Sequence, residues 1–121
     1  MRIFKNTWFT RFADKEGITD TELKETVDRL ETGHADADLG GDVYKMRVAR
    51  LGEGKSGGYR VIVFFRSEER TFFHYGFAKS SLGNINKREL KEMKKRAKNY
   101  FTLSDEQIRI QLKNGTLLEI T

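Results

Sequence analysis

Apolar and polar positions alternate most clearly in the middle of the chain, between residues 43 and 78. Runs rich in Val, Ile, Phe and Tyr are separated there by a glycine-rich segment and by the polar sequence Ser-Glu-Glu-Arg. Such runs, broken by turn-forming residues, are typical of strands joined by hairpins. The pattern predicts three consecutive antiparallel strands, Val43–Arg50, Tyr59–Arg66 and Thr71–Ala78.

Helical spacing replaces this alternation on both sides of the strands. Capping-box sequences, in which a capping residue precedes Glu or Gln by three positions, begin at Thr19, Asn86 and Ser104. Each is followed by an apolar stripe at helical spacing. These signals predict helices over about Asp20–Thr32, Lys87–Tyr100 and Asp105–Asn114.

Three aromatic residues near the N-terminus, Trp8, Phe9 and Phe12, also recur at helical spacing. We expect Thr7 to be the N-cap of this helix and Gly17 to end it. We interpret the three rings as core residues. The alternative is that Trp8 offers a platform on which a nucleobase stacks.

Short apolar segments at the two ends predict a first strand at Ile3–Lys5 and a final strand or extended tail at Leu117–Ile120. Helices before and after a run of strands favour the α+β class, an antiparallel sheet with helices on one side. The other face of the sheet would then be free for binding. The length fits a single domain, 1–121, with a core of about 1–101 and a C-terminal helix and tail at 102–121.

The predicted strands carry cations beside their apolar residues. Lys45 and Arg47 are two positions apart and share one face of their strand, and Arg60 and Arg66, six apart, share a face of the next. Two more lysines lie at the rims of the sheet: Lys55 in the glycine-rich loop and Lys79 after the third strand. Several cations on one sheet face indicate a polyanionic partner.

Basic charge is concentrated in the second part of the chain. Residues 1–43 hold six basic and ten acidic side chains, whereas residues 44–121 hold seventeen basic and eight acidic ones. This distribution favours a nucleic acid or an acidic protein as partner. The lysines that we predict to contact RNA from the second capped helix are Lys87, Lys91, Lys94 and Lys95.

Several other chemistries are disfavoured by the sequence. The absence of cysteine excludes disulfides and thiolate catalysis, and neither His34 nor His74 has neighbours at metal-ligand spacing. The segment around Lys55 lacks the first glycine of a phosphate-binding loop and is followed by a strand, not a helix. With no apolar run long enough to span a membrane and no signal-peptide pattern, we expect a cytoplasmic protein with no metal and no cofactor.

A cluster of lysines and arginines could cleave RNA through attack by the ribose 2′-hydroxyl. This reaction needs a base for the hydroxyl proton, cations that stabilise the pentavalent phosphorane and an acid for the leaving oxygen. Neighbouring cations lower the pKa of a lysine, which lets it accept a proton. The alternative is that the cations only hold a phosphate backbone, and the spacing of the motifs does not decide between the two.

The order of these motifs resembles the RelE/ParE superfamily of toxin–antitoxin toxins. The resemblance rests on Tyr44-Lys-Met-Arg-Val, the Gly/Lys-rich loop, Gly58-Tyr-Arg-Val-Ile-Val-Phe-Phe and Tyr75-Gly-Phe-Ala-Lys. It covers about Leu23 to Ala97 and is closest to the HigB-like RelE branch. It implies a microbial-RNase-type α+β fold, metal-independent cleavage of ribosome-bound mRNA in the A site, and a cognate antitoxin of the helix-turn-helix type.

The resemblance also suggests site residues. The two catalytic strand lysines of RelE match Lys45 and Arg47, and the arginine of its Gly-Tyr-Arg strand matches Arg60. A later active-site arginine falls on Ser80 and the active-site tyrosine on Asn86. Either those two roles are supplied by Lys55, Arg66, Tyr75 or Lys79, or the protein cleaves RNA poorly, or it does something else.

The leading hypothesis is therefore a ribosome-dependent mRNA endoribonuclease. Arg47 and Arg60 would stabilise the phosphorane, Lys45 would be the base, and Tyr75 or Lys55 the acid. Further RNA contacts would come from Arg66, Lys79 and the lysines of the basic helix. Two alternatives remain open: a ParE-like inhibitor of DNA gyrase, and a nucleic-acid-binding domain without catalysis.

Overall fold

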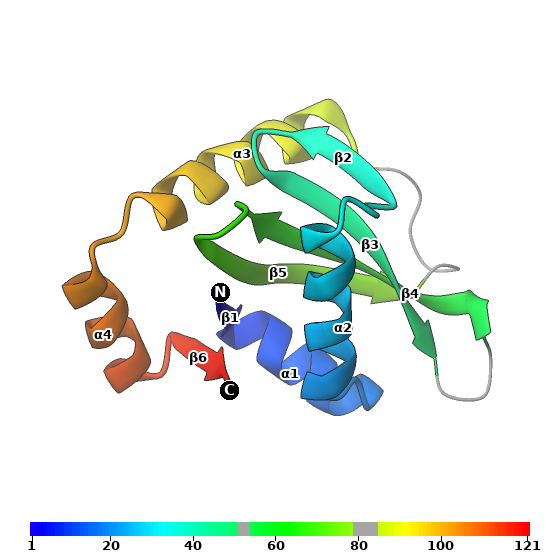
Figure 1. Cartoon of the computed structure of the whole chain (residues 1–121), viewed down its shortest axis with the longest axis horizontal. Coiled ribbons are helices and arrows are strands. Elements are labelled where there is room, and N and C mark those ends of the chain that lie inside the picture. Colours follow the sequence, from blue (N-terminus) through cyan, green and yellow to red (C-terminus); the bar gives the residue numbers. More distant parts are fainter. Residues whose placement is uncertain (51–53, 79–84) are drawn as a thin grey trace.

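The structure is a computed structural model that describes residues 1–50, 54–78 and 85–121, with side chains described for all of these except 50 and 54–57. Helices flank a central sheet (Figure 1). The elements in chain order are β1 (Arg2–Asn6), α1 (Thr7–Glu16), α2 (Asp20–Glu31), β2 (Ala37–Gly40), β3 (Val43–Arg50), β4 (Gly54–Phe65), β5 (Arg70–Ala78), α3 (Lys87–Phe101), α4 (Asp105–Asn114) and β6 (Leu117–Ile120).

Within the described residues the strands form one sheet in the order β2-β3-β4-β5-β1-β6. The central β3-β4-β5 meander is antiparallel, as the alternation predicted. β1 lies parallel to β5 and antiparallel to β6, so the sheet is mixed. Because β1 and β6 come from opposite ends of the chain, the two termini lie close together (Figure 1).

The helix starts were predicted well because their signals are local. All three capping boxes are present, at Thr19, Asn86 and Ser104, each with reciprocal hydrogen bonds to the residue three positions on. The N-cap of α1 was predicted wrongly. Asn6, not Thr7, caps this helix by accepting a hydrogen bond from the Phe9 amide at 2.6 Å. Asparagine is as good a cap as threonine, and β1 delivers it in extended conformation.

One strand prediction also needs correction, and one strand was not predicted. β4 begins at Gly54 rather than Tyr59, so Lys55 belongs to this strand and not to a loop. Glycine disfavours strands, yet the ladder with β3 continues to the Arg50–Gly54 pair through an irregularity after Val48. The acidic segment before residue 42 contains β2, which lacks the β-branched residues of a typical strand and is held by pairing with β3.

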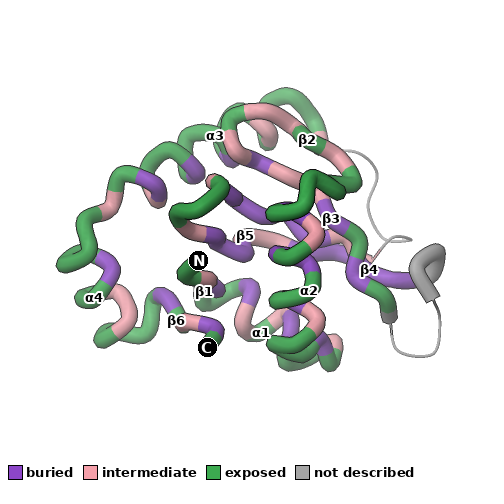
Figure 2. The backbone as a smooth tube through the Cα atoms, viewed as in Figure 1, coloured by how far each residue is buried: buried purple, intermediate pink, exposed green. Residues whose placement is uncertain are grey.

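Apolar clusters lie on both faces of the sheet, and buried positions follow its strands (Figure 2). One face packs against α1 and α2 through residues that include Phe9 and Leu23. The other packs against α3 and α4 through residues that include Phe101 and Ile108. The expectation of one entirely free face was therefore wrong, because the stripe of α3 is apolar enough to cover part of the second face.

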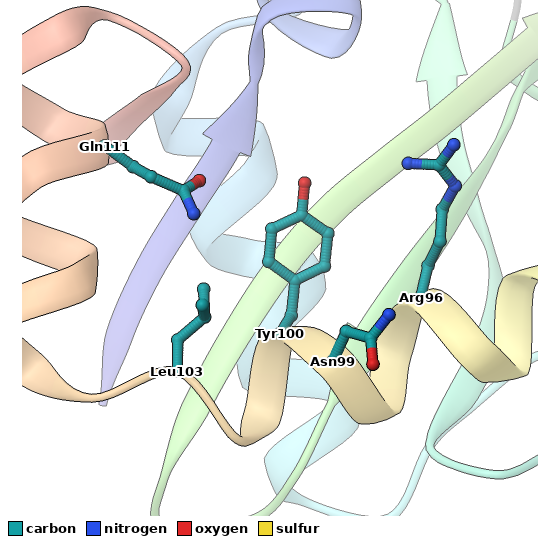
Figure 3. Close-up of a pocket in the computed structure, with 5 residues that line it drawn as sticks. All are labelled: Arg96, Asn99, Tyr100, Leu103 and Gln111. Carbon is teal, nitrogen blue, oxygen red and sulfur yellow. The ribbon is translucent and has the colours of Figure 1, made fainter.

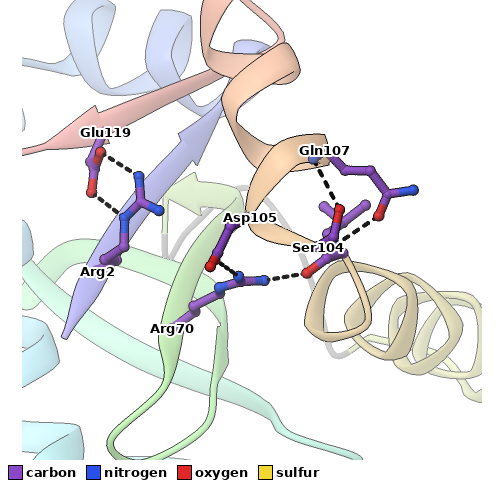
Figure 4. A network of polar contacts seen from close by, with 7 residues as sticks. Arg2, Arg70, Ser104, Asp105, Gln107 and Glu119 are labelled. Atoms are coloured by element: carbon purple, nitrogen blue, oxygen red, sulfur yellow. Dashed lines mark hydrogen bonds and ion pairs between the residues drawn. The ribbon is translucent and has the colours of Figure 1, made fainter.

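The C-terminal helix and strand are fastened to the sheet by two arginines (Figure 4). Arg70 of β5 donates to the Leu103 carbonyl oxygen and pairs with Asp105, both at 2.7 Å. Arg2 of β1 pairs with Glu119 of β6 at 2.8 Å. No helix in the described part of the chain is both long and apolar enough to cross a bilayer.

Gly76 of β5 is a close-packing position whose replacement we expect to destabilise the fold. A Cβ atom added there would lie 2.3 Å from Cε2 of Phe12. The Phe12 ring has little room to move, because it stacks on Trp8 and meets Tyr59 edge-on. Overpacking of this kind lowers stability by about 1–3 kcal/mol, so Gly76→Ala should shift a urea unfolding curve accordingly. In a Phe12→Leu background the loss should shrink; an equal loss in both backgrounds would contradict the clash.

Candidate functional site

Four of the predicted catalytic residues lie on one face of the sheet. Lys45 and Arg47 of β3 alternate with Met46, and Arg60 of β4 follows Tyr59; Met46 and Tyr59 both face the α1–α2 cluster. The cations therefore point to the opposite face, where Tyr75 of β5 packs against the α3–α4 cluster. The prediction that these four side chains lie on one face of the sheet is therefore confirmed.

The α3–α4 cluster covers the other half of this face. Its strand residues include Val43 and Phe64, which oppose each other across β3 and β4. Arg47 and Arg60 also oppose each other, four residues further along each strand, which is about 13 Å away. Arg47 is exposed and Arg60 partly buried. Lys45 and Arg60 pair with Ile62 and Phe77 of this cluster, so the cations lie along its border.

The Arg47–Arg60 pair is unfavourable unless an anion joins it. Like charges directly opposite each other on neighbouring strands repel. Within the described residues, the buried Nη1 atom of Arg60 has no hydrogen-bond partner. A desolvated guanidinium nitrogen without an acceptor is costly, and a phosphate oxygen would satisfy it. This geometry makes the cluster a candidate site for a phosphate diester.

Two residues that the sequence analysis missed hold Arg47 by its backbone. The Arg47 amide donates to Oδ2 of Asp36 at 2.6 Å, and Nη2 of Arg29 donates to the Arg47 carbonyl oxygen at 2.5 Å. Arg29 and Asp36 also form an ion pair at 3.3 Å. β2 pairs with β3 only as far as Lys45, so these side chains bond the β3 backbone where the neighbouring strand has ended. We call this arrangement the Arg29–Asp36 clamp.

A hollow of about 330 Å³ runs beside the clamp between α2 and β3, lined partly by Glu25, Arg29 and Arg47. Its acidic wall is provided by α2. The clamp could not be read from the sequence, because neither side chain belongs to a local motif and the contacts span seven to eighteen positions.

Tyr75 follows a bulge in β5. Tyr75 opposes Ile62 and Phe73 opposes Val63, which leaves His74 as the extra residue. The indole of Trp8 stacks on the Tyr75 ring with centroids 4.4 Å apart. Trp8 itself is 44% exposed, so its interpretation as a core residue was wrong, whereas Phe9 is buried. Trp8 lies in the first turn of α1, and its side chain points to the surface beside β5.

Arg66 is not brought to the cluster. It shares the face of Arg60 but lies just past the other end of β4, about 20 Å away along the strand direction. Its guanidinium pairs with Asp42 at 2.9 Å, lies 3.7 Å from a Glu69 oxygen and sits over the Phe101 ring at 4.5 Å. These contacts fasten α3 to the sheet, a structural task that the sequence did not reveal.

The predicted lysines of the basic helix are all exposed on α3: Lys87, Lys91, Lys94 and Lys95. Lys94 lies over the β2–β3 turn, where a Cβ on Gly41 would be 2.9 Å from its Cγ. Asn86 accepts from the Glu89 amide at 2.8 Å, so its side chain caps α3. Lys79 and Ser80 lie outside the described residues, and so does the side chain of Lys55.

Two further hollows are lined partly by Arg96 of α3. One, of about 210 Å³, lies between α3 and α4 and is lined by Arg96, Asn99, Tyr100, Leu103 and Gln111 (Figure 3). The other, of about 370 Å³, is lined by His74 together with Arg88, Glu89, Glu92, Met93 and Arg96. Burial, with a smaller effect from the nearby positive charge of Arg96, lowers the pKa of His74 from 6.5 to about 4. Its imidazole, stacked on Phe64, is therefore neutral at physiological pH.

The described residues contain no group of three His, Cys, Asp or Glu side chains that could hold a metal ion. Cations on the sheet can act on a bound phosphate through Coulomb attraction and hydrogen bonds.

Comparison with known proteins agrees with this architecture. A family model for the RelE toxin of the RelE/RelB toxin–antitoxin system matches residues 1–120, and so includes α4 and β6 as well as the sheet. A search of the curated proteins finds no match. The α+β fold, with a mostly antiparallel sheet and flanking helices, is the one that the resemblance implied. The chain therefore belongs to the RelE toxin family and is the toxin of a toxin–antitoxin system, which implies a cognate antitoxin as its partner.

Proposed function

We propose that this toxin is a ribosome-dependent mRNA endoribonuclease. The observation that carries the proposal is the pairing of Arg47 with Arg60 across β3 and β4, with one Arg60 nitrogen buried and without a partner in the described structure. Lys45 and Tyr75 lie on the same face of the sheet, on either side of Ile62. A phosphate diester bound there would have two guanidinium groups, an amine and a phenol around it.

The four side chains can be assigned to the three tasks of the reaction. Lys45 takes the proton of the 2′-hydroxyl, which attacks the adjacent phosphorus. Arg47 and Arg60 stabilise the charge that develops on the phosphorane oxygens. Tyr75, or Lys55, gives a proton to the departing 5′-oxygen, so the products are a 2′,3′-cyclic phosphate and a 5′-hydroxyl. This chemistry uses protein side chains only, and Asn86 and Ser80 have no part in it.

Dependence on the ribosome is supported by the charge of α3. Its exposed lysines form a basic surface suited to ribosomal RNA phosphates. Binding through such contacts weakens steeply with salt. This proposal places the toxin in the cytoplasm with translating ribosomes, and the resemblance favours a helix-turn-helix protein as the antitoxin.

The proposal is tested by primer extension on a reporter mRNA in a purified translation system, with and without ribosomes. Cuts that appear only on translated message, and persist when EDTA-treated toxin is added, are the expected result. Cuts on free RNA would contradict ribosome dependence. An intact message from folded toxin in both reactions would reject catalysis, and a supercoiling assay would then test gyrase inhibition.

The Arg29–Asp36 clamp should matter for cleavage through Arg47. Asp36→Ala removes the acceptor of the Arg47 amide and the ion-pair partner of Arg29. Small misplacements of a catalytic group slow reactions strongly, so we expect the single-turnover rate on ribosome-bound mRNA to fall about tenfold or more. Asp36→Asn keeps an acceptor for the amide and should retain most of the rate. Equal losses in both variants would mean that charge, not the backbone bond, is what Asp36 supplies.

A further inference from the structure

The exposed Trp8 is unusual among the aromatic residues of this protein. Trp8 lies in the first turn of α1 and is 44% exposed, while the helix packs through Phe9 and Ala13, which are both buried. The indole nevertheless has a defined position, stacked on Tyr75 with centroids 4.4 Å apart and planes inclined by 25°. A large ring that is held at the surface in a defined orientation can offer its face to a planar ligand group.

Asn6 fixes the position of this ring. Its side chain caps α1 and also donates from Nδ2 to the His74 carbonyl oxygen at 2.9 Å. The pairing of β1 with β5 ends at Lys5 and Phe73, so the chain turns into α1 beside the bulge that precedes Tyr75. One asparagine therefore places the first turn of α1 against β5 and sets Trp8 on Tyr75.

The stacked rings lie next to the cation cluster. Tyr75 opposes Ile62, and Arg60, two residues before Ile62 on β4, opposes Phe77. Tyr75 and Arg60 are thus diagonal neighbours on one sheet face, about 7–8 Å apart. Proteins that bind single-stranded nucleic acid combine aromatic rings, on which bases stack, with cations that hold the backbone. The same combination occurs here.

We propose that Trp8 and Tyr75 form a stacking platform for an unpaired RNA base, next to the phosphate held by Arg60. The proposal rests on the proposed function, because it assigns a base-binding subsite to the same RNA. An apolar protein partner would leave the guanidinium groups of Arg47 and Arg60 unpaired, whereas an RNA strand supplies both the base and the phosphate. Stacking on an indole is tolerant of base identity, so the platform would position the strand rather than read its sequence.

The test is the affinity of the isolated full-length toxin for a fluorescein-labelled RNA hexamer with 2′-fluoro sugars, which lacks the attacking hydroxyl. Fluorescence anisotropy would be measured for wild type, Trp8→Ala, Trp8→Phe and Ile110→Ala, whose exposed side chain lies on α4. We expect Trp8→Ala to weaken binding about tenfold or more, and Trp8→Phe and Ile110→Ala to bind within about threefold of wild type. Binding should also quench the fluorescence of Trp8, the single tryptophan of the chain.

The salt dependence of the RNA affinity distinguishes the contribution of base stacking from that of charge. Trp8→Ala should leave the slope of log affinity against log salt unchanged, whereas Arg60→Ala should lower its magnitude by about 0.7. Unchanged affinity of a folded Trp8→Ala protein would overturn the platform. Because these readouts need no cleavage, they are independent of the ribosome assay. If wild type cleaves mRNA and Trp8→Ala binds the hexamer as tightly as wild type does, only the platform is rejected. If Trp8→Ala binds more weakly but wild type does not cleave mRNA, only the catalytic proposal is rejected.

Discussion

Arg60→Ala is expected to abolish toxicity while leaving the protein at least as stable as wild type. A preorganised group that stabilises developing charge is worth about 10²–10³-fold in rate, so cleavage of translated mRNA should fall by that factor and growth arrest should be relieved. The stability expectation has a separate cause. The buried Nη1 atom has no acceptor in the described structure, and Arg47 opposes it across the strands. Removing the guanidinium relieves both penalties, at the loss of some packing by its aliphatic stem.

The measurement pairs single-turnover cleavage with thermal unfolding of the same preparations. Arg109→Ala is the matched control, because it also removes one guanidinium, from an exposed pair with Glu106 on α4. It should cleave as wild type does. Arg60→Lys keeps the charge but loses the planar fork, and should recover only part of the rate. An Arg60→Ala protein that is folded and fully toxic would remove this residue from the mechanism, and one that unfolds would assign it a structural role instead.

The features that were predicted correctly from the sequence depend on only a few neighbouring residues. The boundaries of α4, Asp105–Asn114, match the prediction because Ser104 and Gln107 form a capping box and Gly115 ends the helix in a left-handed conformation. Likewise, side chains alternate along any strand, so the shared face of Lys45 and Arg47 followed directly from their spacing. Local rules of this kind need no knowledge of the rest of the fold.

What the sequence did not predict depends on contacts between distant segments. Asp36 lies in an acidic stretch that gave no sign of binding the Arg47 backbone. Trp8 has the helical spacing of a core residue, and its exposure is set by the contact between Asn6 and His74. Arg66 has the spacing of a phosphate ligand, but Asp42 and Phe101 already engage it. In each case the residue type indicated what kind of contact the side chain could make. Its role depended on a contact partner that only the fold reveals.

We expect the free energy of unfolding of the toxin to decrease as the pH falls from about 6.5 to 4, because of His74. Burial lowers its pKa to about 4 in the folded protein, whereas an unfolded histidine titrates near 6.5. Between these values the unfolded chain binds a proton that the folded chain does not, so stability declines with falling pH and this contribution levels off below about 4. A difference of this size corresponds to about 3 kcal/mol, a large share of the stability of a small protein.

Urea unfolding at several pH values between 4 and 7 would measure this loss. His74→Phe preserves an aromatic ring to stack on Phe64 but cannot bind a proton, so the part of the pH dependence due to this residue should disappear in the variant. The titration of the imidazole can be followed directly by NMR, since the chain has two histidines and His34→Gln leaves the His74 signal alone. A midpoint near 6.5 for His74, or a parallel pH profile in His74→Phe, would show that the cavity beside α3 admits enough water to solvate the charged ring. A midpoint near 4 would establish that β5 carries a neutral imidazole immediately before Tyr75, which adds no positive charge to the cluster around Arg60.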